Sequence, residues 1–134
     1  MRALVVDDSR AMRALLTNIL QSIGAEVTQA KDGCDALARL RSADRLPDLM
    51  LVDWHMPEMD GLELITQVRK DPAWKPMTVM MVTTESEQEN MVRALLAGAD
   101  EYLIKPFTRD AVLEKLNLLG VRVPEQALAA LTGG

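Results

Sequence analysis

The chain has little cysteine and no long hydrophobic segment. Cys34 is the single cysteine among 134 residues, which excludes an internal disulfide and fits a reducing compartment. Its simplest interpretation is a residue that packs within a helix. No apolar run approaches the ~20 residues that cross a bilayer, and Met1 leads almost directly into Ala-Leu-Val-Val with no secretory signal. We therefore expect a cytoplasmic protein without a membrane segment.

Positive charge is also scarce. The formal net charge is −5 at pH 7, which counts against nucleic acid as a direct partner. The one local basic cluster is Arg39, Arg41 and Arg45, and a solvated helix face explains it better than a phosphate-binding patch does. Hydrophobic residues make up 49% of the chain, enough for one compact domain with a core of its own.

Short apolar runs are spaced along the chain at intervals that leave room for helices. Four of them, at residues 3–6, 49–52, 79–82 and 102–104, are continuous and partly β-branched, which is typical of strands covered on both faces of a parallel sheet. A fifth candidate, at residues 26–30, is more polar, as expected of an edge strand. The alternation predicts an α/β fold with a five-stranded parallel sheet and five flanking helices.

Apolar residues at steps of three and four predict the helices between these strands. The first helix ends at Gly24, the second covers about residues 34–41, and the fifth covers about residues 108–120. Residues 121–134 fall outside the pattern, and Pro124 could begin a short helix there that runs through residue 131.

Two helices carry a recognisable start signal. Ser86 with Glu89 predicts a capping box at the start of the fourth helix, and Asp60 with Glu63 predicts a similar start for the third. In a capping box the first side chain accepts a hydrogen bond from a backbone N–H three residues later. The fourth helix should therefore begin directly after Ser86, and the third directly after Asp60.

Polar side chains follow four of the five predicted strands. Asp7 and Asp8 follow the first, Asp53 follows the third, Thr83 and Thr84 follow the fourth, and Lys105 follows the fifth. The carboxyl ends of parallel strands meet at one edge of the sheet, where ligands bind in such folds. We therefore expect three carboxylates, two hydroxyls and an ammonium group to form one site.

The chemistry of this group favours phosphoryl transfer over hydrolysis by a catalytic triad. Three adjacent carboxylates repel each other unless a cation joins them, and hard oxygen ligands suit Mg²⁺. Lys105 supplies a second positive charge, so a carboxylate could attack a phosphoryl group whose oxygens are neutralised. The structural alternative is a buried salt bridge between Lys105 and one aspartate, which leaves two acids unexplained.

At these residues the chain resembles the receiver domain of two-component response regulators, in particular the stand-alone chemotaxis type of bacteria. The resemblance rests on VVDDS (5–9), LVDWHMPEMDG (51–61), MMVTTE (80–85) and YLIKPF (102–107), and it covers about residues 3–119. It implies a doubly wound, flavodoxin-like sheet of strand order 2-1-3-4-5. A receiver domain would then occupy residues 1–120, with residues 121–134 as a C-terminal extension, either a short helix or disordered.

The resemblance also implies roles for the acidic residues. Asp53 matches the phosphoacceptor of the family. Asp8 matches a direct Mg²⁺ ligand, and Asp7 matches the acid that orients metal-bound water. The backbone carbonyl of His55 matches the third protein ligand of the metal.

Residues on the last two strands match the parts that read the phosphoryl group. Thr83 and Lys105 would each contact a phosphoryl oxygen, and the bond between Lys105 and Pro106 matches a position that is usually cis. Tyr102 matches the aromatic residue that changes exposure on phosphorylation in many relatives. A purely structural tyrosine at a strand start is the alternative.

Three side chains near the phosphoacceptor raise separate hypotheses. We expect Trp54 to be a partly exposed ring over the site that reports metal and phosphoryl binding. His55 is either an exposed loop side chain or, together with Glu85, a residue that sets phosphoryl lifetime. Each of these two follows a site residue by two positions and would flank the path of attacking water.

The favoured function is a switch that accepts a phosphoryl group from a sensor histidine kinase and presents a changed surface, about residues 86–119, to an output protein. It would assist its own phosphorylation and dephosphorylation without being an enzyme, as a monomer or a phosphorylation-dependent homodimer. The first alternative is an enzyme with an aspartyl-phosphate intermediate, although no second acid lies two residues after Asp53. The second is a degenerate receiver that binds a partner constitutively. A chemotaxis-type binder and a phosphorelay intermediate are equally compatible with the sequence.

Overall fold

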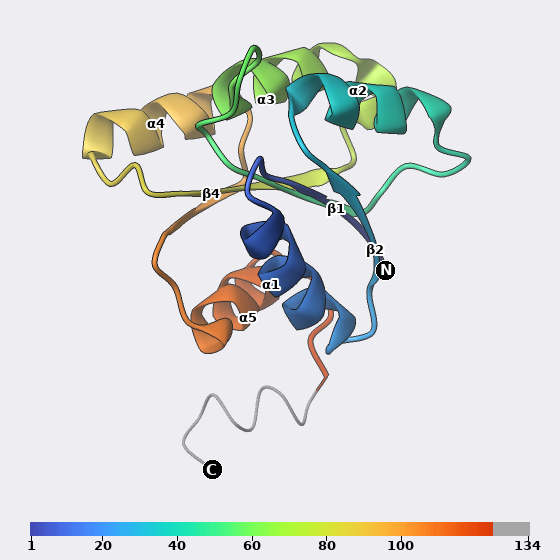
Figure 1. Ribbon diagram of the computed structural model, residues 1–134, viewed down its shortest axis with the longest axis vertical. Helices are drawn as coiled ribbons and strands as arrows, with labels where there is room; N and C mark the ends of the chain where they lie inside the picture. The colour runs from blue at the N-terminus through green and yellow to red at the C-terminus, as the bar shows by residue number, and fades with distance from the viewer. Residues whose placement is uncertain (125–134) are drawn as a thin grey trace.

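The computed structural model describes residues 1–124, and its helices and strands alternate as the sequence predicts (Figure 1). The strands are β1 (Arg2–Val6), β2 (Glu26–Ala30), β3 (Leu49–Val52), β4 (Thr78–Thr83) and β5 (Glu101–Ile104). The α-helices are α1 (Arg10–Gln21), α2 (Gly33–Ser42), α3 (Gly61–Lys70), α4 (Gln88–Ala97) and α5 (Arg109–Leu118). A short 3₁₀ turn, η1 (Pro72–Trp74), lies between α3 and β4.

The five strands form one parallel sheet in the order β2-β1-β3-β4-β5, which confirms the predicted topology. Helices α2, α3 and α4 cover one face of the sheet, and α1 and α5 lie side by side on the other (Figure 1). Strand β2 lies on one side of β1, and β3, β4 and β5 follow on the other side, so the order in which strands are added reverses between β1 and β3. The carboxyl ends of these two strands therefore flank the crevice where doubly wound sheets bind ligands.

Two hydrophobic cores lie on the two faces of the sheet. In β1, Leu4 and Val6 join the core beneath α2, α3 and α4, whereas Ala3 and Val5 join the core beneath α1 and α5. All four side chains are at most 1% exposed. Because alternate residues of a strand point to opposite faces, only a strand buried on both sides is apolar at every position. This burial explains why the sequence of the inner strands does not alternate.

The edge strand β2 is partly exposed, as its polar sequence predicts, but the nearby Cys34 is not buried as expected. Strand β2 has exposed residues at alternate positions, because α2 and α1 cover it only in part. Cys34, at the start of α2, is exposed, so the interpretation of this cysteine as a helix-packing residue is wrong. The buried positions of α2 are Gly33, Ala36, Leu37 and Leu40 instead.

One of the two predicted helix starts is correct. The side chain of Asp60 accepts a hydrogen bond from the backbone N–H of Glu63 at 2.8 Å, so α3 begins as predicted. The capping box of Ser86 and Glu89 is wrong. Helix α4 begins at Gln88, and Glu87 stands at its N-cap without a side-chain hydrogen bond. Ser86 is therefore two residues outside the helix, too early to cap it.

The end of the described chain packs against the second core. Helix α5 begins after Thr108, whose side chain caps it, and Val121 and Val123 then contact the apolar side chains beneath α1 and α5. The short helix expected from Pro124 lies outside the described residues. No helix within residues 1–124 combines the length and the apolar character that a membrane span requires.

Candidate functional site

Four strands carry the predicted site residues to one edge of the sheet. Asp7 and Asp8 follow β1, Asp53 follows β3, and Lys105 follows β5. Thr83 is the last residue of β4 rather than the first residue beyond it. Sheet hydrogen bonds continue past the strand ends, from Asp53 N–H to the carbonyl of Val6 (3.0 Å) and from Lys105 N–H to the carbonyl of Thr83 (2.8 Å). The backbone of the site is therefore held by the sheet itself.

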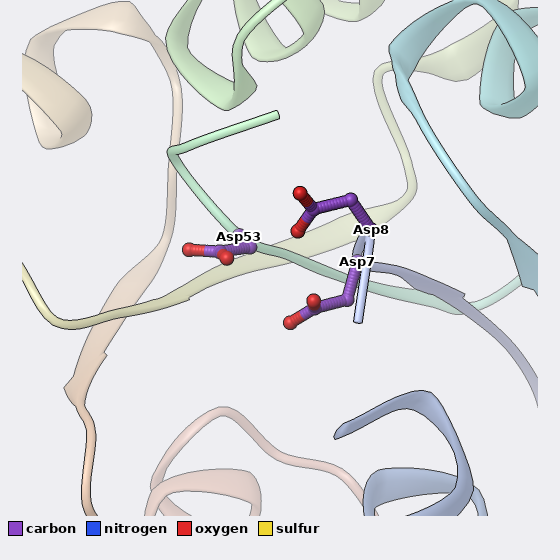
Figure 2. Close-up of side chains that lie close together, drawn as sticks. All are labelled: Asp7, Asp8 and Asp53. Atoms are coloured by element: carbon purple, nitrogen blue, oxygen red, sulfur yellow. The ribbon is translucent and has the colours of Figure 1, made fainter. Parts of the chain in front are cut away.

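The three aspartates form one acidic cluster. Each offers a carboxylate oxygen, and these oxygens all lie within 4.8 Å of one another. Figure 2 shows the three side chains converging from the ends of β1 and β3. Asp7 is 1% exposed and Asp53 is 8% exposed, whereas Asp8 is open to solvent. The cluster thus has two buried acids at its base and one at its mouth.

Lys105 neutralises the base of this cluster. Its Nζ donates hydrogen bonds to Oδ2 of Asp7 at 2.9 Å and to Oδ2 of Asp53 at 3.2 Å. Burial alone would lower the pKa of the Lys105 ammonium group, but the hydrogen bonds and negative charges of the two aspartates outweigh burial and raise this pKa above its usual value. A simple salt bridge therefore accounts for two of the acids and leaves Asp8 without a role.

Asp7 is fixed by contacts that the sequence did not indicate. The backbone N–H of Ser9 donates to Oδ1 of Asp7 at 2.8 Å, and Nη1 of Arg13 donates to the backbone carbonyl of Asp7 at 2.6 Å. Together with Lys105, these bonds hold both carboxylate oxygens of Asp7. Asp7 is thereby suited to orient a neighbour rather than to attack one.

The loop between β3 and α3 passes very close to the backbone of Asp53. The N–H of Gly61 donates to the carbonyl of Trp54 at 2.7 Å. A Cβ on Gly61 would overlap the carbonyl oxygen of Asp53 and would lie 2.9 Å from its carbonyl carbon and from Cα of Trp54. Only glycine fits there, which explains the Asp-Gly pair that ends the motif at residues 51–61.

Trp54 is more deeply buried than its position directly after Asp53 predicts. Its ring is 6% exposed and belongs to the core beneath α2, α3 and α4, so the interpretation as a partly exposed ring is wrong. The guanidinium carbon of Arg93, on α4, lies 5.5 Å from the centre of the Trp54 ring, within the range of a cation–π contact. The ring is therefore a link between the site loop and α4.

His55 and Glu85 contact each other directly. Nε2 of His55 lies 2.6 Å from Oε1 of Glu85, and Nδ2 of Asn90 donates to Oε2 of the same carboxylate at 2.9 Å. The two residues that the sequence singled out separately thus join the loops after β3 and β4. Asn90 was not anticipated, since nothing in the sequence marks which helix residue reaches back to this loop.

Thr83 and Tyr102 are connected through the backbone of Glu85. Oγ1 of Thr83 accepts from the N–H of Glu85 at 3.3 Å, and the hydroxyl of Tyr102 donates to the carbonyl of Glu85 at 2.7 Å. Both side chains are buried. Burial, with smaller effects of the charges of Glu85 and Asp53, raises the pKa of Tyr102 to about 12. The peptide bond between Lys105 and Pro106 is cis.

The donor set suits a hard divalent cation. All three side chains of the cluster offer carboxylate oxygens, their spacing allows one ion to reach them, and Asp8 leaves the mouth open to water or phosphate. This is the ligand chemistry that Mg²⁺ prefers. The fold and site together define a class of protein: a doubly wound α/β domain with an acidic cluster and a lysine at the crevice between β1 and β3.

Comparisons with known proteins agree with this class. The model of the response regulator receiver domain family matches residues 3–117, and the chain belongs to this family. It is 40% identical over 120 residues to the chemotaxis protein CheY1 of Helicobacter pylori, covering 89% of this chain and 96% of that protein. It is 38% identical over 124 residues to the chemotaxis protein CheY-3 of Vibrio cholerae, covering 92% and 94%.

Solved structures agree in fold. The chemotaxis response regulator CheY4 of Vibrio cholerae superimposes with a TM-score of 0.82 at 35% identity, over 88% of this chain and 97% of that one. Membership of the family makes the chain a CheY-like receiver domain of two-component signalling, a class of phosphoacceptor switches rather than of conventional enzymes.

Proposed function

We propose that this protein accepts a phosphoryl group on Asp53 from a phosphohistidine of a sensor histidine kinase and, in response, changes a surface that binds an output protein. The single observation that carries the proposal is the pairing of Lys105 with both Asp7 and Asp53 beside an open acid, Asp8. A salt bridge alone would leave Asp8 without a role, whereas a phosphoacceptor site with a bound cation uses the lysine and all three acids.

In the transfer, a carboxylate oxygen of Asp53 attacks the phosphorus while the bond from phosphorus to the histidine nitrogen breaks. The nitrogen keeps the electron pair of that bond, and an acyl phosphate forms on Asp53. Lys105, already hydrogen-bonded to Asp53, is placed to pair with one phosphoryl oxygen. The hydroxyl of Thr83 can pair with another after it leaves the N–H of Glu85.

Asp8 and Asp53, with the backbone carbonyl of His55, would hold Mg²⁺, and Asp7 would orient its bound water. Bound Mg²⁺ supplies positive charge that neutralises phosphoryl oxygens as the new bond forms. The carboxylates at the base of the cluster are already fixed by Lys105 and by the backbone of Ser9, so the site is pre-organised for that ion.

The hydrogen bonds of Glu85 provide a route from the phosphoryl group to the surface. When the Thr83 hydroxyl turns toward the phosphoryl group, the N–H of Glu85 loses its acceptor. The Glu85 carbonyl is also the acceptor for Tyr102, so movement of this backbone changes what holds the Tyr102 ring. The ring is already buried, and the switch would therefore alter its partner rather than bring it inward from solvent.

The proposed output surface comprises α4, β5 and α5, about residues 86–119. Helix α4 exposes apolar side chains at Val92, Leu95 and Leu96. It follows Thr83 and Glu85 directly, so a small change in that loop acts at its first turn. Phosphorylation can shift the equilibrium between two conformations of this surface only by as much as the phosphoryl group is bound more favourably in one conformation than in the other. The surface could take an output protein or a second copy of the chain.

Phosphotransfer from purified sensor kinases tests the proposal. Each kinase, labelled on its histidine, is mixed with the protein and Mg²⁺, and the label is followed by gel and by intact mass. We expect one kinase to lose its label to the parent chain within seconds to minutes and to keep it when Asp53→Asn is supplied. Equal loss of label to both chains would place the acceptor elsewhere.

The lifetime of the acyl phosphate tests the roles of His55 and Glu85. Their contact joins the two loops beyond Asp53 and Thr83, so its loss should open a path for attacking water. We expect His55→Ala and Glu85→Ala each to decay faster than the parent. Rates within about twofold of the parent correspond to less than half a kcal/mol and would make both residues bystanders.

Amide exchange with beryllofluoride, a phosphoryl mimic, tests the output surface. We expect the mimic to change protection across residues 86–105, because the hydrogen bonds of Glu85 lie at the start of that segment. Changes confined to α1 and α2 would contradict the choice of surface. The same experiment on Asp53→Asn is the control for binding of the mimic outside the site.

A further inference from the structure

The contacts between α4 and the phosphoryl site form a closed ring. Nη1 of Arg93 donates to Oδ1 of Asn90 at 3.2 Å, and Nδ2 of Asn90 donates to Glu85 at 2.9 Å. Glu85 contacts His55 at 2.6 Å. His55 follows Trp54 in the chain, and the Trp54 ring lies beneath the Arg93 guanidinium at 5.5 Å. This closed ring of contacts begins and ends at the loop that follows Asp53.

Within residues 1–124, the side-chain hydrogen bonds made by α4 all belong to this closed ring of contacts, and Met91 and Ala94 add apolar packing against the core that contains Trp54. The N-cap residue Glu87 makes no side-chain hydrogen bond to the helix. The far end of α4 is held differently, since Nε of Arg69 donates to the carbonyl of Gly98 at 2.9 Å and its Nη2 donates to Asp100 at 2.9 Å. Hydrogen bonds from Arg69 thus hold the C-terminal end of α4, and the contacts of Asn90 and Arg93 hold its N-terminal half.

We propose that Arg93 is a positioning residue for the phosphoryl site, which acts through Asn90 on the Glu85 carboxylate and so ties the phosphoryl lifetime to the position of α4. This inference rests on the proposed function, because it concerns the decay of the acyl phosphate on Asp53. Arg93 itself touches neither the acidic cluster nor Lys105, so it contributes no group to the chemistry. The hydrogen-bond route from Arg93 to the site runs through Asn90 to Glu85, the side chain that pairs with His55.

The position of Arg93 allows a partner that binds α4 to change the contacts among Arg93, Asn90 and Glu85. Arg93 is exposed, and it lies on the same helix as the exposed side chains of Val92 and Leu96. A partner that draws Arg93 away from Asn90 would release the Asn90 amide, whose Nδ2 holds one carboxylate oxygen of Glu85. An occupied output surface would then shorten the phosphoryl lifetime, with no group of the partner entering the site.

Decay of the acyl phosphate, measured on the full chain after loading with acetyl phosphate and Mg²⁺, tests the proposal. We expect the acyl phosphate of Arg93→Ala to decay at least about threefold faster than that of the parent. The decay of Arg93→Lys, which keeps a charged donor for Asn90 and a cation beside the Trp54 ring, should stay within about twofold of the parent. Arg41→Ala, an exposed arginine on α2, is the control for the loss of one positive charge, and its decay should match that of the parent.

A double-mutant cycle separates positioning through Glu85 from a general loosening of the fold. If Arg93 acts through Glu85, then Arg93→Ala should add less than about 1.5-fold to the decay rate in a Glu85→Ala background. A multiplied effect of the two changes would overturn the proposal. So would equal decay in Arg93→Ala and the parent, provided that the parent takes up phosphate. A parent that takes up none would contradict the proposed function and this inference together.

The emission of Trp54 provides a readout that needs no phosphate. In a Trp74→Phe background, Trp54 is the one tryptophan, and Arg93→Ala uncovers its ring. We expect the emission to move to longer wavelength in Arg93→Ala and to stay in place in Arg93→Lys. An emission spectrum that Arg93→Ala leaves unchanged would show that the guanidinium does not rest on the ring, and it would overturn the closed ring of contacts.

Discussion

Replacing Gly61 by alanine tests how tightly the loop after β3 holds the phosphoacceptor. The added Cβ overlaps the carbonyl oxygen of Asp53 and lies 2.9 Å from the carbonyl carbon and from Cα of Trp54. Non-bonded heavy atoms attract at ~3.5 Å or more, so the methyl group must withdraw by at least ~0.6 Å from two backbone atoms. Asp53 and Trp54 are both buried, and their backbone cannot yield as an exposed side chain would.

Overpacking of this kind costs about 1–3 kcal/mol, and rigid neighbours place Gly61→Ala near the upper end. Alanine recovers up to about 1 kcal/mol as a better helix former at the start of α3, so we expect a net loss of about 2 kcal/mol in the free energy of unfolding. Displacement of Asp53 should also slow phosphorylation at least about tenfold, since small misplacements of reacting groups have large effects on rate.

Urea unfolding and the rate of phosphorylation by acetyl phosphate measure the two effects. Gly33→Ala is the matched control, because the three atoms nearest to its Cβ, all at 3.0 Å, belong to the side chain of Met59 rather than to the backbone. The control should stay within about 1 kcal/mol of the parent and should be phosphorylated at the rate of the parent. If Gly61→Ala matches this control in both stability and rate, the argument that the loop fixes Asp53 is refuted.

Two further predictions concern the buried charges and hydroxyl of the site. Lys105→Ala leaves Asp7 and Asp53 without their shared cation, so we expect the free energy of unfolding at pH 7 to fall by about 3 kcal/mol and Mg²⁺ to restore much of it; equal urea midpoints with and without Mg²⁺ would count against the ion site. Tyr102 has its pKa raised to about 12 in the folded chain against about 10 when unfolded, so the unfolded chain binds fewer protons and stability falls as pH rises from 10 to 12. The raised pKa of Lys105 also lowers stability as pH rises, so the effect of Tyr102 is measured by comparing the parent with Tyr102→Phe. The difference in free energy of unfolding between these two proteins should shrink from pH 10 to pH 12. A difference that stays constant would contradict the burial of the hydroxyl.

The sequence was sufficient to predict the fold because burial on both faces of the sheet leaves a direct record in composition. Strand β3 is apolar at all four positions, and β2 alternates because it lies at an edge. The edge of the sheet that carries Asp7, Asp53 and Lys105 follows from strand direction alone. These residues were therefore brought together as predicted, with Lys105 between two of the acids.

No pattern in the sequence predicted the contacts between loops and helices. Trp54 was expected to be partly exposed over the site, yet its ring is buried in the core beneath α2, α3 and α4 with Arg93 over it, because the packing of those helices decides whether a loop residue turns inward. Likewise, Ser86 and Glu89 have capping-box spacing, but the hydrogen bonds of Glu85 with Thr83 and Tyr102 hold the loop and delay the helix until Gln88. Tertiary contacts decided both cases.

Intact mass after incubation with acetyl phosphate and Mg²⁺ is the most direct test of phosphorylation on Asp53. The acidic cluster and its lysine predict a single phosphate adduct on the parent chain, little or none in excess chelator, and none on Asp53→Asn. An adduct that survives Asp53→Asn, or one that forms fully in the chelator, would contradict the account.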